Sequence, residues 1–300
     1  MAPALRYEVD GRIARITLDR PRSGNAITAA MPGELAAAVE AADLDPNVHC
    51  MLLSGAGPGF CGGYDLADWA EHFLAGPGSP DDGEPLAPNS VAAQARNHDP
   101  DRIWDPMVDY QGMSRNVRGF MSLMRADKPV ICKVHGFCVA GGTDMALCSD
   151  LLVIAADAKI GYPPARVWGS PTTAVWAARI GVQRAARLLF TGDCLSGAEA
   201  AEWGLAIEAP AAAELDARAE DLAQRVARLP VNQLIMMKLL LNQALLGGGG
   251  LHATQTLGTI LDGITRHTPE GHAFRARAAE AGWRQAVRER DEPFGDYGRR

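Results

Sequence analysis

Two glycine-rich turns, each directly after a short apolar run, constrain the fold of this chain more than any other feature. The first turn, Ser54–Asp65 (SGAGPGFCGGYD), follows the run Cys50–Ser54, and the second, His135–Asp144 (HGFCVAGGTD), follows Val130–Val134. Short apolar runs bounded by turn residues are typical of buried strands. Because glycine has no Cβ, the two turns predict bends where backbone N–H groups can closely approach a ligand.

The remaining pattern predicts an α/β fold. Leu5–Val9 and Ile13–Leu18 alternate apolar and polar residues around Asp10-Gly11, which indicates a β-hairpin. Leu151–Ala155 is a further buried strand, and a helix is expected to begin near Thr28. Strands that alternate with helices in this way indicate α/β rather than a sandwich.

The C-terminal part of the chain is expected to be helical. One helix is predicted to start after Pro230 and to stop at the glycine run 247–250, and the segment Ala273–Arg288 is rich in Arg and Ala. These last helices are amphipathic enough to pack on a partner subunit. Residues 76–100 instead form a long polar stretch rich in Gly and Pro, which we expect to be either a surface insertion or a lid.

Composition and charge exclude several classes of protein. The 300 residues carry a net charge of −7, which argues against nucleic-acid binding. No run reaches the roughly 18 apolar residues of a membrane span, and Met1–Arg12 has no apolar stretch typical of a secretory signal. The six cysteines are scattered in apolar runs, so we expect buried free thiols and a cytoplasmic location. Without a Cys-x-x-Cys or His-Glu-x-x-His motif, no metal site is expected.

The chemistry of the two glycine turns has more than one interpretation. Two N–H donors, one from each turn, could converge on one oxygen as an oxyanion hole, and a helix that begins near Gly142 would add its dipole. The spacing Gly55-x-Gly57-x-Gly59 differs from the dinucleotide-binding fingerprint, and no Gly-Lys-Ser/Thr follows either turn, which excludes a P-loop. A purely structural role for both turns remains open at this point.

Several ordered motifs resemble one known family. These are Pro21–Ala26, Ser54–Leu66, Lys128–Val130 leading to Gly136 and Ala140–Gly142, Cys148–Asp150, Ala185–Gly192 and Ala198–Leu205. Together they resemble the crotonase (enoyl-CoA hydratase/isomerase) superfamily, in register from residue 5 to about residue 246.

The resemblance implies a fold, a ligand and an assembly. The fold would be a spiral of ββα units over residues 1–200, with an inserted loop at about 76–100 and a C-terminal helical oligomerisation region over residues 201–300. The ligand would be an acyl-coenzyme A thioester with no further cofactor, because coenzyme A is part of the substrate. The assembly would be a homotrimer or a dimer of trimers.

The resemblance also implies roles for individual residues. The backbone N–H groups of Tyr64 and Gly141 would hold the thioester oxygen and stabilise the enolate. The path of coenzyme A would be lined by residues of the first turn and of the preceding segment, namely Asn25, Ala26, Cys61, Gly62, Gly63, Asp65 and Leu66. A thiol nucleophile at Cys61 is a weaker alternative to a small buried filler.

The chain departs from the pattern of family hydratases, which carry two glutamates. The first position is Asp144, which keeps a carboxylate but is about 1.5 Å shorter. We expect it to act as a general acid/base, with the stabilisation of a helix start as the alternative. The second position aligns with Pro164, which transfers no proton. Substitutes could come from Asp81, Asp82 or Glu84, and Arg166 could clamp a substrate carboxylate or form a structural ion pair.

These observations leave three functional hypotheses. The first is an enoyl-CoA hydratase in which Asp144 handles the proton. The second keeps the site but performs double-bond isomerisation, hydrolysis or decarboxylation, of which isomerisation needs only one base. The third, which Pro164 favours, is an acyl-CoA-binding protein without catalysis. The length and structure of the acyl chain do not follow from the sequence.

Overall fold

The sheet at the centre of the molecule begins with the expected hairpin. The structure is a computed structural model and describes residues 3–66, 106–246 and 250–295. Strands β1 (Leu5–Asp10) and β2 (Ile13–Leu18) pair antiparallel, with Asp10 opposite Ile13. Gly11 has a φ of +58°, as the two-residue turn requires. The hairpin predicted from the alternating residues is confirmed.

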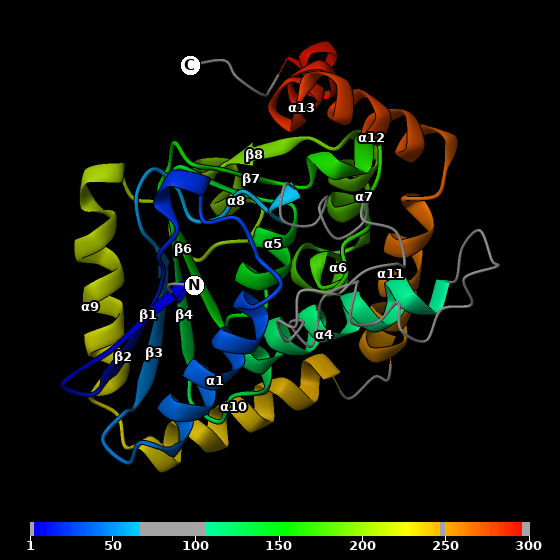
Figure 1. The fold of residues 1–300 in the computed structure, drawn as a ribbon. Helices are drawn as coiled ribbons and strands as arrows, with labels where there is room; N and C mark the ends of the chain where they lie inside the picture. The colour runs from blue at the N-terminus through cyan, green and yellow to red at the C-terminus, as the bar shows by residue number, and fades with distance from the viewer. Residues whose placement is uncertain (1–2, 67–105, 247–249, 296–300) are drawn as a thin grey trace.

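Three further strands extend this sheet in parallel, in the order β1-β2-β3-β4-β6. They are β3 (Cys50–Gly55), β4 (Val130–Val134) and β6 (Leu151–Ile154). A second sheet, in the order β5-β7-β8, contains β5 (Phe137–Val139), β7 (Lys159–Gly161) and β8 (Cys194–Ser196). Because β5 follows β4 after one tight bend, the second glycine turn connects the two sheets (Figure 1).

Helices cover both faces of the larger sheet. Helix α1 (Met31–Leu44) packs on β1, β2 and β3, and α4 (Pro106–Arg125) packs along α1. Helix α9 (Leu215–Ala227) contacts β2, β3, β4 and β6 from the opposite face (Figure 1). Helix α1 begins at Met31 rather than near Thr28, because the Thr28 Oγ1 accepts a hydrogen bond from Met31 N at 3.3 Å.

Shorter elements connect the sheets to the C-terminal helices. Four short helices come after β5 and before α9 in the chain. They are α5 (Gly141–Ala146), α6 (Trp176–Ile180), α7 (Val182–Thr191) and α8 (Gly197–Glu202). After α9 the chain forms α10 (Val231–Leu246), α11 (Gly250–Thr265), α12 (Pro269–Ala281) and α13 (Trp283–Asp291). The 3₁₀ helices are Pro21–Ser23, Pro163–Arg166, Ala212–Glu214 and Glu292–Phe294. None of the helices within the described ranges is both long and apolar enough to cross a membrane.

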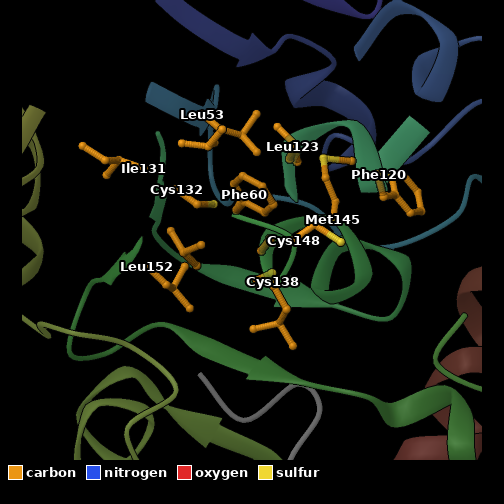
Figure 2. Packing of buried hydrophobic residues seen from close by; sticks show 14 of the residues in the cluster. Leu53, Phe60, Phe120, Leu123, Ile131, Cys132, Cys138, Met145, Cys148 and Leu152 are labelled. Carbon is orange, nitrogen blue, oxygen red and sulfur yellow. The ribbon is translucent and has the colours of Figure 1, made fainter. Parts of the chain in front are cut away.

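The hydrophobic core lies between the larger sheet and the helices on both of its faces, with α1, α4 and α5 on one side and α9 on the other. Figure 2 shows Leu53 and Cys132 beside Phe60, whereas Ile131 points away from Phe60, Phe120 and Met145. All six cysteines are free thiols and five of them are buried, which confirms the expectation of buried free thiols.

The C-terminal helices return to the glycine-rich turns. Helix α11 packs on α4, and α13 packs on α12 and on the 3₁₀ helix Pro163–Arg166 (Figure 1). The C-terminal helix α13 therefore packs against the segment that contains Pro164. The boundary at residue 200 between the ββα core and the C-terminal helical region stays a prediction. The polar stretch 76–100 lies outside the described residues.

Candidate active site

Asn25 holds the first glycine turn in place. Its side chain is fully buried, and Nδ2 donates to Ala56 O at 2.8 Å and to Gly59 O at 2.9 Å. Its Oδ1 accepts a hydrogen bond from Arg20 N at 2.9 Å. These bonds satisfy backbone carbonyls of a turn that has no regular hydrogen-bonding ladder. Asn25 therefore fixes the shape of the turn.

Backbone hydrogen bonds join the two glycine turns. Cys61 N donates to Phe137 O at 3.1 Å, and Val139 N donates to Cys61 O at 3.0 Å. Cys61 and Cys138 are consequently neighbours in a short parallel bridge. The two turns, far apart in sequence, meet immediately before Gly63 and Gly141.

Gly63 and Gly141 are tightly packed at this junction. Gly63 has a φ of +96°, and a Cβ on it would lie 2.7 Å from Ala140 Cβ and 3.6 Å from Gly141 N. A Cβ on Gly141 would lie 2.7 Å from Tyr64 Cε2. Real Cβ atoms do not tolerate such distances, so each position requires glycine.

The peptide groups around this junction have defined directions. Ile27 N donates to Gly63 O at 2.8 Å, and Asp65 N donates to Ile27 O at 3.0 Å. Since N–H directions alternate along an extended segment, Tyr64 N–H points away from Ile27. Gly141 is the first residue of α5, where an N–H has no acceptor within the helix.

A cavity of about 160 Å³ lies beside this junction. Both turns contribute to its wall through Gly62, Tyr64, Val139 and Ala140. Further apolar and aromatic side chains on the wall are Leu66, Met113, Tyr162, Pro163, Pro164, Val167, Trp168, Phe274 and Val287. Trp168 meets Phe274 of α12 edge-on, with ring centroids 5.6 Å apart. A mostly apolar cavity with few polar groups is typical of a small-molecule site.

Asp144 lies near this cavity but not on its described wall. The carboxylate is fully buried and accepts four hydrogen bonds. Thr172 donates to Oδ2 from N at 3.3 Å and from Oγ1 at 3.2 Å, and Thr173 donates to Oδ1 from N at 3.0 Å and from Oγ1 at 2.7 Å. Burial raises the pKa of Asp144 to about 6, and the bonds from Thr173 and Thr172 oppose that shift.

Two tyrosines on the wall are close enough to Asp144 to feel its charge. Burial, and next the charge of Asp144, raise the pKa of the Tyr64 and Tyr162 hydroxyls. Both phenols therefore stay protonated near neutral pH and are able to donate hydrogen bonds.

A charged cluster on α11 reaches the same cavity. Asp262 and Arg266 line the wall, and the Arg266 guanidinium pairs with Asp262 and, at 2.8 Å, with Asp109 of α4. Asp262 Oδ1 also accepts a hydrogen bond from Ser170 N at 3.2 Å. Sequence reasoning missed Asp262 and Arg266, because a carboxylate and an arginine four residues apart on a helix are equally typical of an exposed pair.

The contacts of Arg166 favour a structural role over the predicted place in the substrate site. Its side chain is 1% exposed and pairs with Asp291 at 3.1 Å and Asp193 at 3.6 Å. Its Nε donates to Thr191 O at 3.2 Å. Arg166 is not among the described residues on the cavity wall, although its neighbour Pro164 is. The buried Asp291 and the partly exposed Asp193 hold the guanidinium, which supports the alternative of a structural ion pair.

The other predicted binding residues differ in their positions. Gly62 and Leu66 line the cavity. Ala26 O accepts a hydrogen bond from Arg20 Nη1, and Asp65 pairs with Arg20 at 2.9 Å, so both help to shape the turn. Cys61 Sγ donates to Asn25 O at 3.2 Å, and burial raises the pKa of this thiol to about 12, which disfavours a nucleophilic thiolate.

The carboxylates predicted as possible substitutes for the second glutamate remain to be placed. Asp81, Asp82 and Glu84 lie outside the described residues. Within the described ranges, no three His, Cys, Asp or Glu side chains form a group that could hold a metal ion.

Comparison with known proteins agrees with this architecture. The family model for enoyl-CoA hydratase/isomerase matches residues 8–79 and 107–249. EchA13 of Mycobacterium tuberculosis, a protein named for enoyl-CoA hydratase, is 32% identical over 80% of this chain and 73% of its own. The 1,2-epoxyphenylacetyl-CoA isomerase of Escherichia coli is 30% identical over 85% and 84%, respectively.

A solved structure of an enoyl-CoA hydratase from Mycobacterium smegmatis is more similar still. It is 59% identical, covers 99% of this chain and 96% of its own, and superposes with a TM-score of 0.88. The chain therefore belongs to the enoyl-CoA hydratase/isomerase family, and its fold is the mixed α/β crotonase fold with C-terminal helices. The resemblance drawn from the glycine turns is confirmed, and the chain is an enzyme of this family.

Proposed function

We propose that this enzyme is an enoyl-CoA hydratase, which adds water across the Cα=Cβ bond of a 2-enoyl-CoA thioester. The observation that carries the proposal is the meeting of Gly63-Tyr64 with Gly141 beside the apolar cavity. The naming of EchA13 and of the solved relative for the same reaction supports it.

In the proposed reaction the thioester oxygen accepts hydrogen bonds from Tyr64 N and Gly141 N. Water oxygen bonds to Cβ, the π electrons move toward the thioester, and the resulting enolate oxygen is stabilised by the two amides. Cα then receives a proton. Backbone donors of this kind are each worth about 3 kcal/mol in the transition state.

The sequence predicts Asp144 as the proton-transfer residue, and its burial and hydrogen bonds bear on that role. Its pKa of about 6, raised by burial, suits a group that exchanges protons near neutral pH and supports this role. Its four donors, and its absence from the described wall of the cavity, weigh against direct contact with the acyl chain.

The proposed path of coenzyme A follows the first glycine turn. Gly62 and Leu66 would contact the bound thioester from the cavity wall. Asn25, Ala26, Cys61, Gly63 and Asp65 would act by shaping the turn, since the contacts given for them are with the turn itself, with the segment 20–26 or with the second turn. Coenzyme A enters as part of the substrate, and we propose no further cofactor.

Isomerisation of an acyl-CoA double bond is the second candidate function. The proline at position 164 on the cavity wall provides no carboxylate where family hydratases carry one, and a shift of a double bond needs only one base. The similarity to 1,2-epoxyphenylacetyl-CoA isomerase of Escherichia coli supports this candidate.

We also propose a cytoplasmic location and a trimer or a dimer of trimers. The free thiols support a reducing compartment. Helix α10 exposes Met236, Leu239, Leu240 and Leu241, the last at 69%, and such a contiguous apolar face is typical of a protein interface. Sedimentation of the purified enzyme checks the assembly, and a monomer at micromolar concentration would contradict it.

The test of function is a product assay with purified enzyme. We expect 2-enoyl-CoA thioesters of several chain lengths to lose their conjugated absorbance and to gain the mass of one water. A product of unchanged mass would instead indicate isomerisation, and release of thiol would indicate hydrolysis. Tight binding of acyl-CoA without any product would overturn the enzymatic proposal in favour of a binding protein.

A further inference from the structure

We propose that Asp262 of α11 is the catalytic carboxylate that exchanges a proton with the acyl group. The inference rests on the proposed hydration of a 2-enoyl-CoA. It assigns to the C-terminal helices a chemical role that none of the motifs of the glycine turns provides.

The position of Asp262 carries the first step. Among the described residues that line the cavity, Asp262 is the only carboxylate. The same wall presents a proline at position 164, where the family's second glutamate is expected. Asp144 is held away by four hydrogen bonds from Thr172 and Thr173. A substrate in the cavity would therefore lie against Asp262.

The anchoring of Asp262 carries the second step. Ser170 N donates to Oδ1, and the Arg266 guanidinium pairs with Oδ2. These contacts fix the orientation of the carboxylate, as a proton-transfer group requires. Each oxygen has two lone pairs, so both can still accept a hydrogen bond from water.

The charge balance of the cluster carries the third step. Arg266 is shared between Asp262 and Asp109, and Asp109 also meets His267 Nε2 at 2.9 Å, so Asp262 shares its guanidinium with a second carboxylate. Burial raises the pKa of Asp262, while Arg266 opposes that shift. A buried carboxylate that shares its arginine with a second carboxylate accepts a proton more readily than a carboxylate with an arginine of its own.

The proposed step balances without a co-reactant. As the oxygen of water bonds to Cβ, Asp262 takes one proton from that water, and the π electrons of Cα=Cβ move to form the enolate. The protonated Asp262 then gives the same proton to Cα. The C–OH and C–H bonds replace the double bond and one O–H bond, and the carboxylate is regenerated.

The test compares two carboxylates that share the same arginine. D262N removes the proton acceptor from the wall, and D109N removes the other partner of Arg266, which is not among the described residues on the wall. We expect the kcat of D262N on a 2-enoyl-CoA to fall about 10²–10⁴-fold, the range of general acid/base catalysis, with little change in KM. D109N is expected to keep kcat within about tenfold.

D262E provides a second variant that keeps the charge opposite Arg266. It is expected to remain folded, to recover part of the kcat lost in D262N and to shift the dependence of kcat on pH, and this shift decides the question if D262N does not fold. Calorimetric binding of a saturated acyl-CoA to each variant checks that the cavity is intact.

Three outcomes would overturn the assignment: a D262N kcat within threefold of the parent enzyme, an equal loss in D109N, or a folded D262E whose dependence of kcat on pH is the same as that of the parent. Failure of the proposed function is distinct from these. In that case the parent enzyme itself would convert no 2-enoyl-CoA, and no comparison of variants would be needed to see it.

Discussion

The amide and the hydroxyl of Thr173 both donate to Oδ1 of Asp144, at 3.0 and 2.7 Å. Thr173 lies in the segment between the 3₁₀ helix Pro163–Arg166 and α6, so these bonds join the start of α5 to the second half of the chain. Removing the carboxylate would leave buried donors without an acceptor, a change that is costly in a protein interior.

The first prediction concerns pH and the Asp144 carboxyl. Its folded-state pKa of about 6 lies above the value of 3.8 for an unperturbed carboxyl, so the native state binds the proton more tightly between these values. The stabilisation from protonation is fully present below pH 4 and is lost as the pH rises through about 6. Its size is about 3 kcal/mol at most.

Denaturant unfolding of the parent and of D144N between pH 4 and pH 7 measures this contribution. We expect the difference in the free energy of unfolding between the two proteins to change with pH in this window. A constant difference would show that Asp144 does not titrate between pH 4 and pH 7 in the folded protein.

The second prediction concerns Gly141. In G141A the new Cβ meets Tyr64 Cε2 at 2.7 Å, which displaces either the ring or the Gly141 amide. Loss of one oxyanion donor lowers kcat about 10²–10³-fold. The matched control is G33A on the exposed side of α1, where a Cβ meets nothing within 4 Å. G33A should keep full activity and gain about 0.5–1 kcal/mol of stability. Equal activities of G141A and the parent would remove Gly141 from the oxyanion hole.

The elements that position the site were largely predictable from local sequence. Val130–Val134 forms β4 as expected, because a short apolar run between turn residues has few alternatives to a buried strand. Gly141 begins α5 one residue before the expected start. The meeting of Gly63 with Gly141 followed only from the family resemblance, since sequence spacing does not tell which turns meet in space.

The missing parts of the site depend on contacts between segments remote in sequence. Asp262 was not predicted because the helical pattern of 250–265 does not reveal that α11 packs on α4 and reaches the cavity. The ion pair of Arg166 was equally hard to predict, since its partner Asp291 lies 125 residues further along. A lone charged residue in a sequence gives no indication of the distant carboxylate that will hold it.

The third prediction separates the Tyr64 amide from its ring. Y64F removes the hydroxyl but keeps the main-chain N–H that is proposed to bind the thioester oxygen. A neutral hydrogen bond is worth about 1 kcal/mol, so turnover of a 2-enoyl-CoA should stay within about tenfold of the parent. A loss of more than a hundredfold, with acyl-CoA binding retained, would identify the phenol itself as a proton donor.

The fourth prediction tests whether Arg166 is structural. Its guanidinium is buried against Asp291, and removal of one partner of a buried pair costs about 3–5 kcal/mol. We expect R166M to lower the free energy of unfolding by about 3 kcal/mol, the low end of this range, because Arg290 still pairs with Asp291 at 2.7 Å. The KM of the folded variant should be close to that of the parent. Denaturant unfolding and steady-state kinetics measure the two effects.

The matched control for R166M is R218M, which removes an exposed ion pair with Glu208. Water and salt screen such a pair, so R218M should change the free energy of unfolding very little. A large rise in KM in R166M with unchanged stability would instead support the hypothesis that Arg166 clamps a substrate carboxylate. In that case the guanidinium would have to leave Asp291 when substrate binds, because a cation held by the buried Asp291 and by Asp193 has little attraction left for a third anion.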